Sequence, residues 1–194
     1  RTTEAVGPGW VVQPDHVELF EDFNVPRALE HAVSRAADVA VVRHLYGPPD
    51  DGARAGFAAR MSAVGAFASD EGVAVQAWSA FGMDAAVWLC GNEGAVLLAL
   101  DEPSAFEALL ETITQTDLAR TELAAAHPEV DLVVYRGWYS SLDLWAPALF
   151  DKLLAPRIRR VADAAHRHGK RLAYVMTTGV QRLAGRLADA GVDV

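Results

Sequence analysis

The sequence predicts an α/β fold in which parallel strands are covered by helices. Short runs of mainly apolar residues at 73–78, 131–135 and 171–176 are predicted to be strands, and residues 192–194 enter a fourth. Segments with apolar residues at helical spacing separate these runs. Nearly continuous apolar strands that alternate with helices are typical of a parallel sheet, in either a doubly wound fold or a (β/α)8 barrel. No glycine-rich phosphate motif follows any strand, which weakens the dinucleotide-binding version of the former.

The first part of the chain, residues 1–72, is predicted to be helical and irregular. Glycine, proline and scattered aromatic residues predict irregular structure over 1–25, with a short helix near 15–22. Pro26 suits a helix N-terminus and starts a segment that we expect to be helical in part. A further helix is expected to stop at Gly72.

Residues 73–194 are predicted to form the β/α units of the same single domain. After the first strand we expect short helices that break at Gly91, and then a strong helix that ends before Pro128. The helix before the third strand contains Pro156, which should kink or split it, and Gly169 should end it. A last amphipathic helix leads into the final residues.

The composition excludes several classes of protein. The 194 residues, of which 52% are hydrophobic, are enough for one domain with a buried core. Lys and Arg total 17 against 26 Asp and Glu, and this net charge of −9 argues against a nucleic-acid or anionic-membrane partner. The single cysteine, Cys90, excludes an intrachain disulfide and a cysteine-rich zinc site. No apolar run approaches the roughly 18 residues that span a bilayer and no signal peptide is visible, so we expect a cytoplasmic protein.

Both ends of the sequence indicate a piece of a larger domain. Arg1 stands where an initiator methionine is expected, and the last residues step from a helix into a new strand. We therefore expect open sheet edges that are covered by further sequence or by another copy of the chain.

The candidate ligand-binding residues follow the predicted strands. In both doubly wound sheets and (β/α)8 barrels, chemistry takes place at the carboxyl ends of the strands. None of these residues is identified as catalytic by the sequence alone. The candidates after the three strands are Ser79, Phe81 and Asp84; Arg136, Trp138, Tyr139, Ser140 and Ser141; and Met176, Thr177 and Thr178.

Two of these candidates are charged and have ordinary structural alternatives. Arg136 can bind a carboxylate or phosphate through its guanidinium, or form a rim salt bridge with Asp143 or Asp131. Asp84 can act as an acid or base, or cap the helix that follows it.

The aromatic and hydroxyl candidates also have two interpretations. Trp138 and Tyr139, with Trp145, can stack on a flat ring or fill a cap or subunit interface. The hydroxyl side chains can hydrogen-bond a ligand or satisfy nearby backbone groups, which is the commoner role of such residues.

From residue 73 onward the chain resembles the uroporphyrinogen decarboxylase superfamily, which also contains cobalamin- and coenzyme-M-linked methyltransferases. The resemblance rests on the stretches GNEGAVLLALDEPSAFEALLETI, SSLDLWAPALFDKLLAPRIRRVADAAHRHGKRL and LAGRLADAGVDV, which occur in the family's order and spacing. It implies a (β/α)8 barrel of which this chain covers only part. It also implies a homodimer.

The resemblance also bears on whether a metal site lies at the end of the third predicted strand. In the methyltransferase branch this strand ends in His-x-Cys-Gly, and the His and Cys bind a catalytic zinc ion. Aligned on Gly179, this chain has Met176 and Thr178 at those positions. Zinc prefers thiolate, imidazole and carboxylate ligands, so we expect no zinc here.

The activity that the resemblance implies first is that of a metal-independent, decarboxylase-like lyase of porphyrin biosynthesis. It would need no cofactor and would act on a carboxylated, tetrapyrrole-like substrate. The family's substrate-contacting serine falls near Ser140 and Ser141, whereas its substrate-contacting tyrosine falls near Val87 and Trp88, where this chain differs. A corrinoid-linked methyltransferase relative without the zinc site, and a non-catalytic binding or assembly module, are the alternatives.

Overall fold

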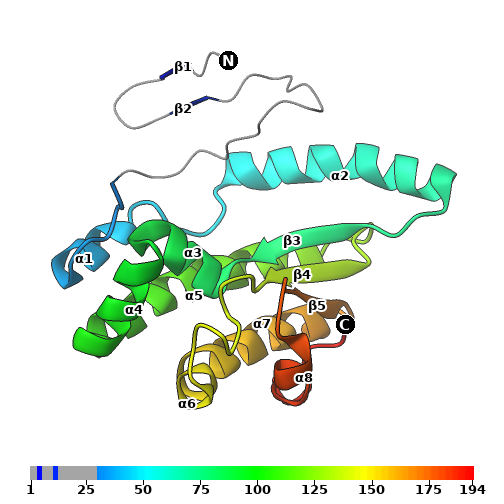
Figure 1. The fold of residues 1–194 in the computed structure, drawn as a ribbon. Helices are drawn as coiled ribbons and strands as arrows, with labels where there is room; N and C mark the ends of the chain where they lie inside the picture. The colour runs from blue at the N-terminus through cyan, green and yellow to red at the C-terminus, as the bar shows by residue number, and fades with distance from the viewer. Residues whose placement is uncertain (1–3, 6–10, 13–29) are drawn as a thin grey trace.

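The computed structural model describes residues 4–5, 11–12 and 30–194 of the chain (Figure 1). The short strands β1 (Glu4–Ala5) and β2 (Val11–Val12) pair antiparallel. The helix predicted near 15–22 and the helix start predicted at Pro26 lie outside the described residues.

The segment expected to be helical in part contains short helical turns, and one long helix follows it. The 3-10 turn η1 (Ala36–Asp38) and the helix α1 (Val39–Val42) are followed by α2 (Asp51–Glu71). The Asp50 carboxylate caps α2 by accepting a hydrogen bond from the Ala53 amide at 2.7 Å. Gly72 ends α2 in the left-handed conformation, at the predicted position.

A sheet of three parallel strands forms the centre of the structure and confirms the strand predictions. The strands are β3 (Gln76–Ala80), β4 (Leu132–Arg136) and β5 (Arg171–Val175), and they are neighbours in that order. β3 begins later than the predicted residue 73. The reason lies at Val75, whose amide is bound by the Asp131 side chain at 2.7 Å instead of by a strand partner.

The final residues continue the sheet beside β5, as the sequence predicts. The Asp193 amide donates to the Leu172 carbonyl and the Tyr174 amide donates to the Val194 carbonyl, both at 2.9 Å. The pairing runs parallel because both partners advance along the chain together. The helix α8 (Val180–Asp189) connects β5 to this fourth segment.

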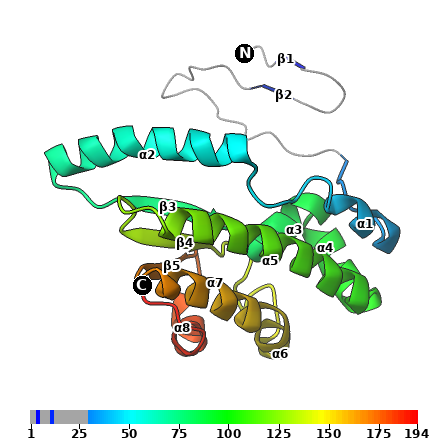
Figure 2. The same cartoon turned by 180° about the vertical axis from the view of Figure 1, so that it is seen from behind.

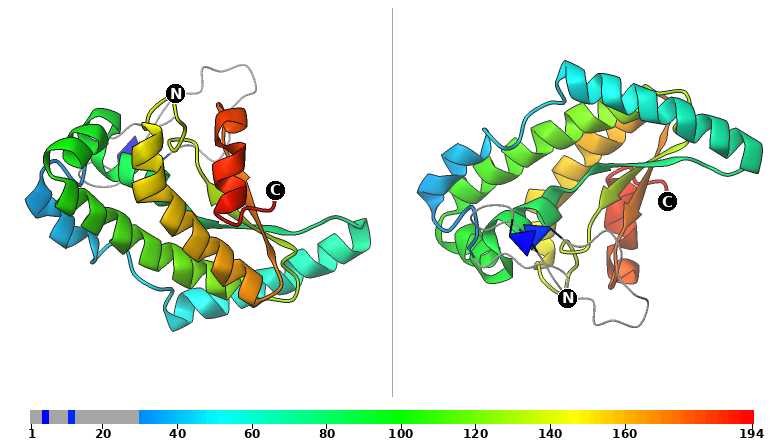
Figure 3. Two further views of the ribbon diagram at one scale, coloured as in Figure 1. Left: turned by 90° about the horizontal axis from the view of Figure 1, so that it is seen from below. Right: turned by 90° about the horizontal axis from the view of Figure 1, so that it is seen from above.

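Two long helices cover one face of the sheet. α5 (Pro103–Ala125) and α7 (Ala155–Arg167) lie side by side in front of the strands in Figure 2, and Figure 3 shows the same pair from below and from above. Strand side chains alternate between faces, so Val133 and Leu172 point into the core beneath these helices. Trp78 and Arg136 belong to the opposite face.

Two breaks in the helices have identifiable causes. The predicted break at Gly91 separates α3 (Gly82–Cys90) from α4 (Asn92–Asp101), which meet at 101°. Before α7, the short helix α6 (Pro147–Leu149) runs into a π-helical turn, η2 (Phe150–Leu154). Pro156 has no amide hydrogen to donate, and the helix is therefore interrupted just before it, as predicted.

Among the described residues, no single helix is long and apolar enough to cross a membrane. α3 and α4 reach the required length and composition only as a pair, with the bend between them.

Gly82 lies at the junction of β3 and α3, where no other residue fits. Its φ angle is +42°, and a Cβ atom at this position would lie 1.7 Å from the Tyr135 hydroxyl oxygen. Gly94, inside α4, provides a matched control, because a Cβ there would meet its nearest neighbour, Cys90, at 3.7 Å.

We predict that Gly82→Ala lowers the free energy of unfolding by roughly 3 kcal/mol, from overpacking and backbone strain combined. Gly94→Ala should change it little or raise it by up to about 1 kcal/mol, since alanine favours the helix. Urea unfolding followed by circular dichroism measures both. Equal effects of the two substitutions would contradict the close packing of Tyr135 on Gly82.

Candidate functional site

A group of charged and aromatic side chains gathers where β4 ends. We call it the Arg136 cluster, and it consists of Asp84 and Trp88 from α3, Arg136 from β4, and Trp138 from the following loop. The Arg136 guanidinium carbon lies 3.8 Å from the centroid of the Trp138 ring and 4.7 Å from that of Trp88. Its Nε lies 3.2 Å from Asp84 Oδ2. The cation is thus held between two indoles and paired with a carboxylate.

Asp84 connects α3 to the loop that follows β4. Its side chain is fully buried, and it accepts hydrogen bonds from the Tyr139 amide at 2.9 Å and the Trp138 amide at 3.3 Å. The carboxylate is thus hydrogen-bonded to two amides and paired with the Arg136 guanidinium. The alternative that Asp84 caps its helix is wrong, because it lies inside the first turn and binds none of the helix amides.

Arg136 forms an ion pair, but both partners that the sequence suggested are wrong. Asp143 faces Arg182 at 3.5 Å, and the Asp131 carboxylate binds the Val75 amide at the other end of the sheet. Arg136 pairs with Asp84 instead, a partner that is far from it in the sequence.

Burial changes the protonation of Asp84. Its removal from water raises the pKa to about 6, while the hydrogen bonds from Tyr139 and Trp138 and the charge of Arg136 act in the opposite direction. The Asp84 carboxyl therefore gains its proton at a pH closer to neutral than an exposed aspartate does.

A second buried carboxylate holds the start of α3. Asp117, on α5, accepts hydrogen bonds from the Gly82 amide at 2.8 Å and the Phe81 amide at 3.1 Å. Its Oδ1 has no hydrogen-bond partner among the described residues. Burial raises the pKa of Asp117 to about 7, against the effect of these two amides. Asp117 thereby fixes the junction that carries Asp84.

Two stacked tyrosines form a rigid layer beneath the cluster. The rings of Tyr135 and Tyr174 are 5.2 Å apart, and burial raises the pKa of both phenols above the ordinary value, so both stay neutral. Gly137 allows this packing, because a Cβ there would lie 2.2 Å from the Tyr174 ring. The Tyr174 hydroxyl and Ser140 Oγ are buried and have no hydrogen-bond partner within the described part of the chain.

The remaining candidates after β3 and β4 divide between the cluster and the core. Phe81 contacts Trp88, with ring centroids 5.6 Å apart. Tyr139 is half-buried beside Asp84. Ser79 is buried against α5, where its Oγ accepts a hydrogen bond from Thr121 at 2.9 Å, and Ser141 Oγ accepts one from the Asp143 amide at 3.3 Å.

Trp145 belongs to the core. It stacks on Phe106 with ring centroids 5.8 Å apart, and its Nε1 donates to the Tyr139 carbonyl at 2.8 Å. Its role is therefore to support the loop that carries Trp138 and Tyr139.

The candidates after β5 form a separate part of the same edge. Met176 is half-buried against the core, whereas Thr177 and Thr178 are exposed. A thioether and two hydroxyls do not fit the ligand set of a zinc ion. Among the described residues, no group of three or more His, Cys, Asp or Glu side chains is placed to share a metal ion.

Sequence reasoning missed Trp88 and Asp117 as members of this region. Trp88 was noted only as a departure from the family, although it flanks Arg136. Asp117 lies one helical turn after Ile113, on the buried face of α5. A carboxylate on an apolar helix face indicates a buried polar contact, because charged residues are rarely buried without a partner. Trp78, which is 42% exposed, lies on the same face of the sheet as Arg136.

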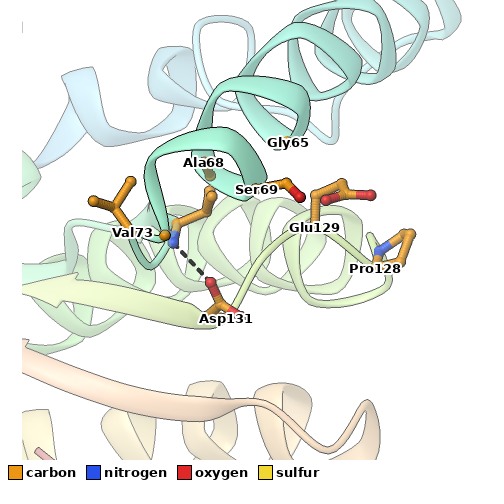
Figure 4. A pocket seen from close by; sticks show the side chains of 9 residues that line it. Gly65, Ala68, Ser69, Val73, Pro128, Glu129 and Asp131 are labelled. Atoms are coloured by element: carbon orange, nitrogen blue, oxygen red, sulfur yellow. Dashed lines mark hydrogen bonds between the residues drawn. The ribbon is translucent and has the colours of Figure 1, made fainter.

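A pocket of about 230 Å³ lies at the opposite end of the sheet, where β3 and β4 begin (Figure 4). Its two carboxylates differ in their surroundings. Asp131 binds the Val75 amide, whereas Glu129 lies against Gly65 of α2, where a Cβ would approach it to 2.5 Å. The pocket is lined by Gly65, Ala68, Ser69, Gly72, Val73, Val75, Pro128, Glu129 and Asp131.

Comparison with known proteins bears on the fold through structural likeness. No protein-family model matches this chain, and no curated protein does. A solved methyltransferase from Methanosarcina mazei resembles it with a TM-score of 0.55 and 14% sequence identity. The match covers 81% of this chain and 39% of the methyltransferase, so the chain spans well under half of that protein. The likeness shows a shared fold.

The protonation of Asp117 predicts a pH-dependent stability. The folded state binds the proton of Asp117 more tightly than the unfolded chain does, so protonation of Asp117 stabilises the fold. This stabilisation is fully present below the ordinary pKa of 3.8 and is lost as the pH rises through about 7. Asp117→Asn keeps an acceptor for the two amides and removes the charge. As the pH rises over that range, the free energy of unfolding of this variant should therefore fall by roughly 2–4 kcal/mol less than that of the parent.

Urea unfolding of both proteins from about pH 4.5 to about pH 8 tests this expectation. Asp163→Asn, which alters an exposed carboxylate on α7, serves as the control and should follow the parent curve. Parallel curves for the parent and Asp117→Asn would show that Asp117 does not titrate in this window.

Proposed function

We propose that this chain contributes β/α units to a methyltransferase-like (β/α)8 barrel that binds a flat, anionic ring compound at the carboxyl ends of the strands. The observation that carries the proposal is the Arg136 guanidinium held between two indoles. Trp88 and Trp138 are 43% and 40% exposed, so their rings also offer free surface to a ligand.

The chemistry of the Arg136 cluster favours an anion with a conjugated ring. Asp84 engages Nε of Arg136, and the two terminal nitrogens have no hydrogen-bond partner among the described residues. Such a fork matches a carboxylate or phosphate in a bidentate geometry. Indole faces bind flat rings by stacking, which contributes about 0.5–1.5 kcal/mol per pair beyond the buried area.

The barrel is supported by the parallel order of the strands and by the start of a fourth strand beside β5. The likeness to a methyltransferase favours that branch of the superfamily over the decarboxylases. The decarboxylase-like activity that the sequence placed first has no support in this comparison. Homodimer formation remains a prediction, which sedimentation analysis can test.

The role we assign to this part of the chain is to hold the ring compound. Met176 and Thr178 do not suit the zinc ion that activates a thiol in related methyltransferases, so no such step is assigned to them. Cobalamin, a corrinoid, carries both a macrocycle and a phosphodiester. Uroporphyrin carries carboxylates around a flat macrocycle. The two compounds therefore separate the methyltransferase-like proposal from the decarboxylase-like alternative.

We predict that the chain binds hydroxocobalamin, as measured by titration calorimetry, and that Arg136→Gln and Trp138→Ala each weaken the binding about tenfold. Arg60→Gln, a change of an exposed arginine on α2, is the control and should leave the affinity unchanged.

Uroporphyrin is titrated in parallel. Binding of uroporphyrin alone would overturn the methyltransferase-like assignment in favour of the decarboxylase-like one. Failure of both compounds to bind, or binding that ignores Arg136 and Trp138, would contradict the site itself.

A further inference from the structure

Arg136 already has one anionic partner before any ligand binds. Asp84 Oδ2 lies 3.2 Å from Nε, and the Arg136 side chain is only 17% exposed. An anion bound to the two terminal nitrogens would lie on the order of 5 Å from the Asp84 carboxylate, a separation at which charges shift each other's protonation. Two anions would then share one cation in a partly buried site.

We propose that the Arg136 cluster is a proton-coupled anion site, in which Asp84 takes up a proton when an anionic ligand binds to Arg136. This inference rests on the proposed ligand site, and it adds how that site responds to pH. The proton neutralises the carboxylate that would otherwise repel the ligand, so the bound state keeps a single anion beside the guanidinium.

Asp84 is placed to accept this proton and keep its shortest hydrogen bond. The Tyr139 amide donates to Oδ1 at 2.9 Å, whereas Arg136 and the weaker Trp138 contact are on Oδ2. Protonation of Oδ2 leaves the Oδ1 hydrogen bond intact. Burial has already raised the pKa of Asp84 to about 6, so a further rise brings its titration to neutral pH.

The other titratable groups around Asp84 do not provide the same coupling. Tyr135 from β4 and Tyr174 from β5 feel the Asp84 charge, but burial keeps both neutral. Burial also raises the pKa of Asp117 from α5, to about 7, yet its carboxylate accepts hydrogen bonds from the amides of Phe81 and Gly82 and does not pair with Arg136.

The test uses 1-pyrenesulfonate, a flat aromatic anion whose own charge does not change in this range. We expect titration calorimetry to show about tenfold tighter binding at about pH 5.5 than at about pH 7.5. Near pH 7, buffers of different ionisation enthalpy should reveal an uptake of about half a proton or more per ligand bound.

Three variants assign the proton to Asp84. Asp84→Asn should bind the sulfonate with an affinity that is independent of pH and without proton uptake. Asp117→Asn, which removes the other buried carboxyl, and Asp143→Asn, which removes an exposed one from the same loop as Trp138, should both retain the coupling.

The outcomes separate this inference from the proposed function. Binding that depends on Arg136 but shows no proton uptake in the parent protein would overturn the coupling and leave the ligand site standing. Proton uptake that persists in Asp84→Asn would likewise overturn it. No binding of the sulfonate at either pH would overturn the coupling together with the ligand site. The buffer experiment needs only the parent protein, so an absence of proton uptake overturns the coupling even where Asp84→Asn fails to fold.

Discussion

The organisation of this edge of the protein depends on one buried carboxylate, that of Asp84. It joins α3, which follows β3, to the loop that follows β4, because it accepts hydrogen bonds from two amides of that loop and pairs with Arg136. A buried charge is costly unless it is paired and hydrogen-bonded, and here three donors meet that requirement. Removal of the carboxylate would leave the Trp138 and Tyr139 amides and the Arg136 guanidinium without their acceptor at the same time.

The surrounding residues make this arrangement rigid. Asp117 holds the first amides of α3, and the stacked rings of Tyr135 and Tyr174 support the cluster from below. Gly82 and Gly137 are needed because the tyrosines approach their backbones too closely for any side chain. The site is therefore preorganised: the guanidinium is fixed between its indoles by packing and by its ion pair with Asp84 before a ligand arrives, which lowers the entropy cost of binding.

The parts of the fold that could be predicted from sequence are those set by local pattern. The runs around Val133 and Leu172 are apolar enough to mark buried strands, and Gly72 and Pro156 mark helix boundaries through their backbone chemistry. The pairing of Arg136 could not be predicted, because Asp84 is distant in sequence while Asp131 and Asp143 are near. Which carboxylate faces the guanidinium is decided by how α3 packs against β4. The same limit explains why Trp88 and Asp117 were missed: their importance comes from tertiary contacts.

The most direct test of this account is a crystal structure of the chain with 1-pyrenesulfonate bound. The account predicts a sulfonate within hydrogen-bond distance of the terminal nitrogens of Arg136, a pyrene ring against Trp138, and an Asp84 carboxyl still in contact with the Tyr139 amide. A sulfonate bound elsewhere, or an Arg136 side chain that points away from Trp88 and Asp84, would contradict it.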